Sequence, residues 1–174
     1  MKKTIVLLLS VFFISSIGFC QLEVGKKASA WKFPDSNKKM FSMRSWPGKV
    51  LQINYVDPDV SDLNDHFNDV IDVAADDGTI LRDGYKGFGI VDCKASWKPN
   101  FLIKKIAGNK AKKYDTTILF DTEAVLRNQW GLDDDSYSII IVDKQRIVRY
   151  ICKGRMPDAD IQKVVKLLAK LSRE

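Results

Sequence analysis

The sequence has no Cys-x-x-Cys motif, and it contains only three cysteines, Cys20, Cys93 and Cys152. A dithiol redox site needs two closely spaced cysteines at the start of a helix, where the pKa of the first thiol is lowered and the reactive thiolate forms. The widely separated cysteines of this chain do not meet that requirement. The sequence therefore excludes the usual dithiol mechanism of disulfide exchange.

Histidine is nearly absent too, since His66 is the only one. The chain also has no Ser/His/Asp motif, no glycine-rich phosphate loop and no His/Cys spacing typical of zinc sites. His66 lies three residues after Leu63 and four before Val70, at the border of an expected apolar helix face, which favours a boundary side chain over a catalyst. The formal net charge is only +6, and many lysines fall on expected amphipathic helices, so we expect no nucleic-acid partner.

Long hydrophobic runs are missing except near the N-terminus. There, Lys2 and Lys3 precede an apolar run at 5–17 that is short for a membrane span and is followed by small residues at 18 and 20. This pattern predicts a secretory signal peptide cleaved after Cys20, hence a periplasmic or secreted protein without a transmembrane segment after cleavage. A lipoprotein anchored through Cys20 is the alternative, and the bulky Phe19 beside the cysteine argues against it.

After the N-terminal segment, apolar runs alternate with helical spacings. We predict that Asp59 or Ser61 caps the first helix. Parallel strands joined by helices, followed by a hairpin and a final helix, form the thioredoxin arrangement, an α/β fold with a central mixed sheet flanked by helices. The patterns predict strands at 50–56, 88–93, 116–120, 137–142 and 147–152, with helices near 63–74, 100–106, 124–130 and 158–171.

Short segments resemble exported thioredoxin-like and peroxiredoxin-like domains. The run W-G-L-D-D-D-S-Y-S at 130–138, with the strand after it, resembles the YtfJ-type periplasmic proteins. With the predicted signal peptide at 1–20 removed, this resemblance implies a single thioredoxin-like domain at 21–174, with an N-terminal extension of the exported thioredoxin/peroxiredoxin type. The other segments that carry the resemblance are 24–28, 31–35, 46–50, 118–123 and 139–144.

The chain departs from active relatives at the places that matter for redox chemistry. On the thioredoxin template, Asp59-Val60-Ser61-Asp62 falls near the two cysteine positions. The loop 133–136 has no proline before the strand at 137–142, whereas active relatives have a cis-proline there that shapes the substrate groove. Both departures indicate a redox-inactive domain.

Cys93 and Cys152 are expected to be buried free thiols. On the template they end strands on opposite sides of the central strand, beyond the ~7 Å Cα separation that a disulfide allows, so no disulfide is expected. Cys93 lies at the carboxyl end of a parallel strand, at the edge where α/β folds bind ligands, and it is the one candidate catalytic residue. Trp97 lies close to the same edge, although tryptophans more often fill cores than bind ligands.

Aspartates form a second candidate site. On the template the 57–62 turn and the 133–135 loop face each other across the former active-site groove, so their carboxylates should lie together. No cofactor is expected, but calcium is the alternative because it takes several oxygen ligands. Solvated loop residues and helix caps are the ordinary explanation of such aspartates. The candidate binding residues are Asp57, Asp59, Asp62, Asp133, Asp134 and Asp135.

The sequence thus favours an exported, redox-inactive binding module for an unknown protein or small ligand of the cell envelope. One alternative is a thiol oxidoreductase or peroxidase-like enzyme that uses Cys93. The other is a structural protein of the envelope.

Overall fold

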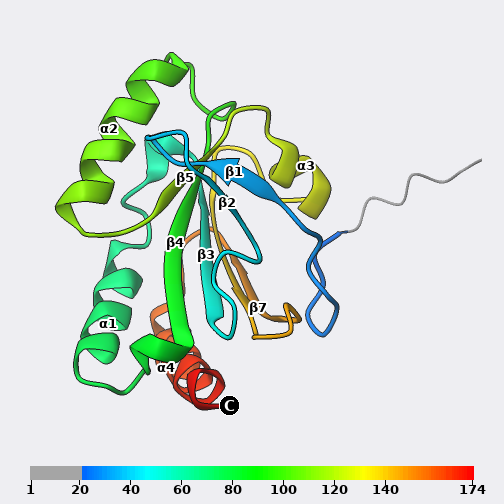
Figure 1. Cartoon of the computed structure of the whole chain (residues 1–174), viewed down its shortest axis with the longest axis vertical. Coiled ribbons are helices and arrows are strands. Elements are labelled where there is room, and N and C mark those ends of the chain that lie inside the picture. Colours follow the sequence, from blue (N-terminus) through cyan, green and yellow to red (C-terminus); the bar gives the residue numbers. More distant parts are fainter. Residues whose placement is uncertain (1–20) are drawn as a thin grey trace, which may run out of the picture.

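The computed structural model describes residues 21–174 (Figure 1). The predicted signal peptide, with Cys20, lies outside the described residues. The strands are β1 (Lys32–Pro34), β2 (Met40–Ser42), β3 (Val50–Val56), β4 (Tyr85–Asp92), β5 (Ile118–Asp121), β6 (Tyr137–Val142) and β7 (Val148–Lys153). The helices are α1 (Asp65–Asp76), α2 (Asn100–Lys113), α3 (Val125–Trp130) and α4 (Asp158–Arg173), with 3-10 turns η1 (Pro58–Val60) and η2 (Arg82–Gly84).

Five strands form one mixed sheet in the order β5-β4-β3-β6-β7. β3, β4 and β5 are parallel, and β6 and β7 run antiparallel to their neighbours. β3 is the central strand, and nearly all of its residues are buried because helices and other segments cover both faces of the sheet. The predicted mixed sheet flanked by helices is therefore present.

Helices cover both faces of this sheet. Along α4 the buried residues recur at helical spacing, and they pack with Phe67 and Ile71 of α1 against one face. On the opposite face, α3 contributes Leu126 and Trp130, and β1 contributes Phe33. Figure 1 shows α3 across the sheet from α1 and α2. None of the helices within 21–174 is long and apolar enough to cross a membrane.

The segment before β3 is fastened to the sheet by stacking and by one arginine. The Trp46 ring stacks on Phe88 of β4 at 4.6 Å between centroids. Arg146, in the β6–β7 turn, donates hydrogen bonds to the carbonyl oxygens of Met43, Trp46 and Lys49 at 2.7–2.9 Å. These contacts seat the N-terminal segment on the turn between the last two strands.

The start of α1 differs from the prediction. Asp57, rather than Asp59 or Ser61, provides the capping oxygen, and it caps η1 by accepting the Asp59 N–H at 2.7 Å. The chain then makes further turns, and α1 begins only at Asp65. The predicted cap was wrong because the Asp57 carboxylate at the end of β3 accepts the Asp59 N–H in a 3-10 turn, and Asn64, which precedes α1, makes no side-chain cap.

Strand boundaries differ more modestly. β4 begins at Tyr85 because it pairs with β3 along its whole length, whereas the apolar pattern placed its start at Phe88. Its last residue is Asp92, so Cys93 lies just beyond the strand. β6 and the start of α4 have the predicted positions.

Candidate functional site

Three neighbouring parallel strands each lead into an aspartate at the same edge of the sheet. Asp57 follows β3, Asp92 ends β4 and Asp121 ends β5. Their residues are 4%, 1% and 0% exposed, respectively. This is the edge at which α/β sheets place ligands, so three buried carboxyl groups lie where chemistry is expected.

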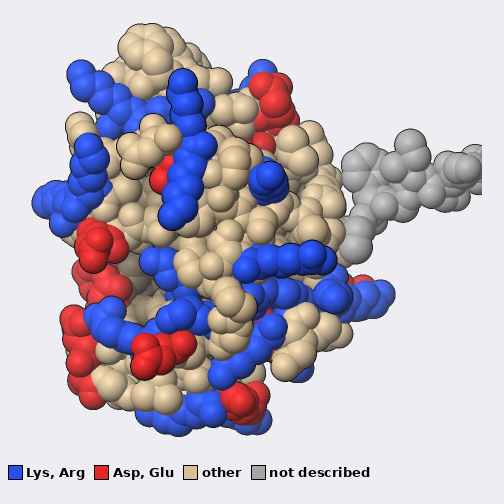
Figure 2. All heavy atoms as spheres, viewed as in Figure 1, with Lys and Arg blue, Asp and Glu red and all other residues tan. Residues whose placement is uncertain are grey.

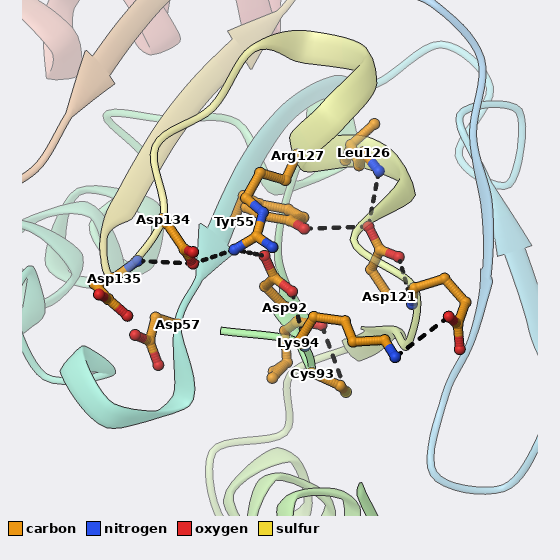
Figure 3. A network of polar contacts seen from close by, with 12 residues as sticks. Tyr55, Asp57, Asp92, Cys93, Lys94, Asp121, Leu126, Arg127, Asp134 and Asp135 are labelled. Carbon is orange, nitrogen blue, oxygen red and sulfur yellow. Dashed lines mark hydrogen bonds and ion pairs between the residues drawn. The ribbon is translucent and has the colours of Figure 1, made fainter. Parts of the chain in front are cut away.

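The Asp121 carboxylate stabilises the start of α3 (Figure 3). Its carboxylate accepts the Tyr55 hydroxyl at 3.1 Å and the N–H groups of Val125 and Leu126 at 2.9 and 2.8 Å. These N–H groups open α3, whose preceding residue Ala124 has no side-chain oxygen to cap it. Burial and the nearby carboxylates raise the pKa of Tyr55, which keeps its hydroxyl protonated as a donor.

Asp92 belongs to an ion-pair chain. The Arg127 guanidinium of α3 lies 3.2 Å from the Asp92 carboxylate and also contacts Asp134 in the loop before β6 (Figure 3). Burial raises the pKa of Asp92, whereas the Lys94 N–H and Arg127 act in the opposite direction. One guanidinium thus lies between two carboxylates from different parts of the fold.

Asp57 has no comparable partner. Its N–H donates to the Ser136 carbonyl at 3.0 Å, and this bond brings the end of β3 beside the loop before β6. In Figure 3 the side chains of Asp57 and Asp135 point toward each other. Burial first, and then the charges of Asp135, Asp92 and Asp134, raise the pKa of Asp57 to about 6. Within residues 21–174, neither Asp57 nor Asp135 forms an ion pair with a cationic side chain.

The predicted carboxylates separate into two groups. Asp57 and Asp135 face each other, and Asp134 lies beside Asp135. The other three pair with lysines instead. Asp59 contacts Lys98 and Ser96, Asp62 lies 3.1 Å from Lys110, and Asp133 lies 3.2 Å from Lys153.

The described part of the chain holds no group of three or more His, Cys, Asp or Glu side chains arranged to bind a metal ion. The carboxylates at the sheet edge already accept hydrogen bonds or contact Arg127, and these interactions compete with metal coordination. This arrangement suits a cationic group that forms hydrogen bonds better than a bare ion that needs several oxygen ligands.

Cys93 lies next to the site but is not presented to it. Its residue is 3% exposed and packs with Val91, Ile103 and Phe120 beneath α2. Burial raises the pKa of the Cys93 thiol to about 11, so little of the nucleophilic thiolate forms near neutral pH. Cys152 is also a buried free thiol, in a different hydrophobic cluster.

Sequence reasoning missed four residues of this site. Asp92 and Asp121 had a recognisable pattern, an aspartate directly after an apolar strand run, repeated on adjacent parallel strands. Tyr55 and Arg127 had none, because a strand tyrosine and a short-helix arginine are ordinary residues there. Only the fold brings them to the carboxylates.

The described fold resembles several solved structures. With the thioredoxin domain of a thiol-disulfide oxidoreductase from Bacteroides vulgatus the TM-score is 0.63 and the identity 16%, over 85% of this chain and 99% of that one. With an exposed lipoprotein thioredoxin from Streptococcus pneumoniae the values are 0.59 and 15%, over 80% and 99%. With a secreted disulfide oxidoreductase of Mycobacterium tuberculosis they are 0.56 and 14%, over 81% and 96%. These likenesses confirm the thioredoxin-like fold.

Sequence comparison identifies the family. A Haemophilus influenzae protein described as uncharacterized is 30% identical over 64 residues, which are 37% of this chain and 35% of that protein. The sequence profile of one bacterial family matches residues 24–171, nearly all of the described chain. The resemblance seen in the segment 130–138 is thereby confirmed, and the chain belongs to the family described as bacterial protein of unknown function (YtfJ_HI0045).

Proposed function

We propose that the chain is an exported thioredoxin-fold module without thiol chemistry, which binds a cationic group of a protein or small ligand at the carboxyl edge of its sheet. One observation carries the proposal. Asp57 and Asp135 face each other at the end of the central strand, and neither is paired with a cationic side chain of residues 21–174. A ligand that supplies the positive charge would stabilise both carboxylates.

The neighbouring ion pairs indicate the kind of cation. Arg127 already lies between Asp92 and Asp134, so the edge accommodates a planar guanidinium with its hydrogen bonds. A ligand's ammonium or guanidinium would make the equivalent contacts with Asp57 and Asp135. Calcium is the less favoured ligand, because it requires more oxygen atoms than this pair offers.

A cysteine-dependent oxidoreductase is the alternative function, and the fold shared with thiol oxidoreductases favours it. Such an enzyme would need Cys93 as a thiolate, yet burial holds the pKa of this thiol near 11. No observation specifically favours a purely structural role in the envelope.

The redox half of the proposal is tested by insulin reduction with purified 21–174 protein and its Cys93→Ser variant. We expect no turnover from either protein. Thiol titration should find both cysteines slow to react in the native protein and fully reactive in denaturant. Turnover that depends on Cys93 would establish the alternative enzyme instead.

The binding half is tested by titration calorimetry with a tri-arginine peptide and, separately, with calcium chloride. We expect binding of the peptide that is lost in Asp57→Asn/Asp135→Asn. Asp83→Asn removes one exposed carboxylate in η2, which precedes β4, whereas the site lies at the carboxyl ends of the strands. This variant is the matched control and should bind the peptide normally. Equal peptide affinity in all three proteins, or no binding by any, would refute a cation site at this edge.

Export rests on the pattern of residues 1–20. Fusion of these residues to an enzyme that is active only outside the cytoplasm tests it. We expect activity, and loss of activity when Lys2 and Lys3 are replaced by Glu, because the positive n-region is required for export. A fusion that stays inactive would refute export.

A further inference from the structure

The outer face of α2 exposes large apolar side chains to solvent. Trp97, in the loop before the helix, is 87% exposed, and Phe101 and Ile106 on the helix are 75% and 54% exposed. Of the fourteen residues in α2, only Ile103 and Gly108 are buried. Leu102 is exposed as well, so apolar side chains project from the first half of α2 and from the loop before it. A cluster of this kind marks an interaction surface.

The same segment is strongly basic. Residues 94–113 include seven lysines and no aspartate or glutamate. Lys94, Lys98 and Lys110 form ion pairs with acidic residues elsewhere in the fold. The remaining four form no ion pair within the described chain, and most of them are exposed. These four are Lys104, Lys105, Lys112 and Lys113.

A shallow cavity of about 310 Å³ adjoins this face, between α2 and the β1–β2 turn. Its polar lining includes amides, a hydroxyl and ammonium groups, but no carboxylate. Gly108 allows the close approach, since a Cβ there would lie 3.0 Å from the Ser36 Cβ. The lining residues are Ser36, Asn37, Phe101, Lys104, Lys105, Gly108, Asn109 and Lys112. Such a lining is suited to an anionic head group.

From this combination we infer that α2 and the loop before it dock the protein onto an anionic phospholipid bilayer. The α2 surface consists of Trp97, Phe101, Leu102, Ile106 and the four lysines without ion pairs. In the docked protein the apolar side chains enter the interface between head groups and acyl chains. The lysines then contact lipid phosphates, some of them at the cavity.

A bilayer fits the α2 surface better than an acidic protein partner does. Trp97, Leu102 and Ile106 are exposed and line no recess shaped for a partner's side chain, and Phe101 only borders the shallow cavity. The lysines have long flexible stems that reach head groups at several depths. Neither the apolar side chains nor the lysines need ligand groups at fixed positions, as they would on the surface of a folded protein partner.

The charge of the neighbouring helix gives the docked protein a defined orientation. α1 carries Asp65, Asp69, Asp72 and Asp76 along its length. Figure 2 shows basic side chains gathered over α2 and acidic ones along α1 below it. An anionic surface attracts the first region and repels the second, so the protein should approach the bilayer with α2 first.

Vesicle sedimentation tests this inference. The full 21–174 protein is mixed with vesicles of phosphatidylglycerol and phosphatidylethanolamine, or of phosphatidylcholine alone, at low and high salt. We expect binding to the anionic vesicles, loss of that binding at high salt, and none to phosphatidylcholine. Trp97 supplies a second readout because it is the only exposed tryptophan of the four, and its fluorescence should shift to the blue on binding.

Paired variants separate the two contributions. Trp97→Ser/Phe101→Ser removes exposed apolar groups, and Lys105→Glu/Lys112→Glu reverses two exposed charges. We expect the lysine pair to weaken partitioning by at least about 25-fold, from roughly fivefold for each lysine near an anionic surface. Val73→Ser and Lys166→Glu alter exposed residues of α1 and α4 and should leave partitioning unchanged.

Four results would overturn the inference. The first is equal binding to both kinds of vesicle, and the second is equal loss of binding in the control variants. The third is failure to sediment with anionic vesicles while millimolar glycerol phosphate stabilises the protein against heat, which would assign the lysines to a free anion. Failure to sediment without that stabilisation would also exclude lipid docking.

Discussion

The Arg127 guanidinium lies 3.2 Å from the buried Asp92 carboxylate and also contacts Asp134, so a single side chain connects α3, the end of β4 and the loop before β6. The Asp92 side chain is 2% exposed and that of Arg127 is 17% exposed. Removal of one partner from such a pair leaves the other charge in a poorly solvated place. The ion pair is therefore costly to break from one side.

We accordingly predict that Arg127→Met lowers the free energy of unfolding by about 2–3 kcal/mol, because Asp92 is left buried without its cation. Adding Asp92→Asn to this variant should restore part of the loss. Urea denaturation of the two single variants and the double variant measures the coupling. Lys163→Met, which breaks an exposed pair with Asp160, is the control and should change stability by less than about 0.5 kcal/mol. Strict additivity of the two substitutions would show that the pair is not coupled.

Asp57 gives a prediction about pH. Its folded-state pKa is about 6, while an unperturbed aspartate titrates near ~3.9. Between these values the folded chain holds more protons than the unfolded chain, so this group lowers the free energy of unfolding as the pH rises from 4 to 6. Asp57→Asn should remove that contribution while its amide oxygen still accepts the Asp59 N–H.

The measurement is urea denaturation of wild type and Asp57→Asn at pH 4, 5, 6 and 7. The variant should gain stability relative to wild type across this range, by on the order of 2 kcal/mol at pH 7. Burial also raises the pKa values of Asp65 and Asp72, but these groups titrate in both proteins and cancel in the difference. Parallel pH curves for the two proteins would contradict the assignment to Asp57.

The fold was largely predictable from the sequence, whereas the site was only partly so. β6 was predicted from the apolar run at 137–142, and α4 from the helical spacing of apolar residues after Asp158. In both elements the local sequence pattern shows which residues are buried. The proximity of Asp57 to the 133–135 loop followed from the thioredoxin template. The pairing of Asp92 with Arg127 did not, because local patterns carry no information about which charges meet across the fold.

Asn64 is predicted to be a structural anchor between α1 and the loop before α4. Its buried side chain donates to the Gly154 carbonyl at 3.0 Å and accepts the Met156 N–H at 2.7 Å. Asn64→Ala should lower the free energy of unfolding by about 2–4 kcal/mol, because the buried Met156 N–H and the partly buried Gly154 carbonyl lose their partner. Thermal and urea unfolding measure the change. Asn128→Ala, at an exposed helix position, should be neutral or stabilising, and a similar loss in both variants would refute the anchoring role.

Two glycines near and within β4 should differ in how much stability they lose on replacement by alanine. A Cβ at Gly84 would lie 1.9 Å from the backbone carbonyl oxygen of Ser172, at the end of α4, so the strand and helix would have to separate. A Cβ at Gly89 would meet only ordinary contacts at 3.8 Å or more. We predict that Gly84→Ala costs at least about 2 kcal/mol in unfolding free energy, whereas Gly89→Ala changes it by less than about 1 kcal/mol. Equal urea midpoints for the two variants would mean that α4 does not pack against the start of β4 in solution.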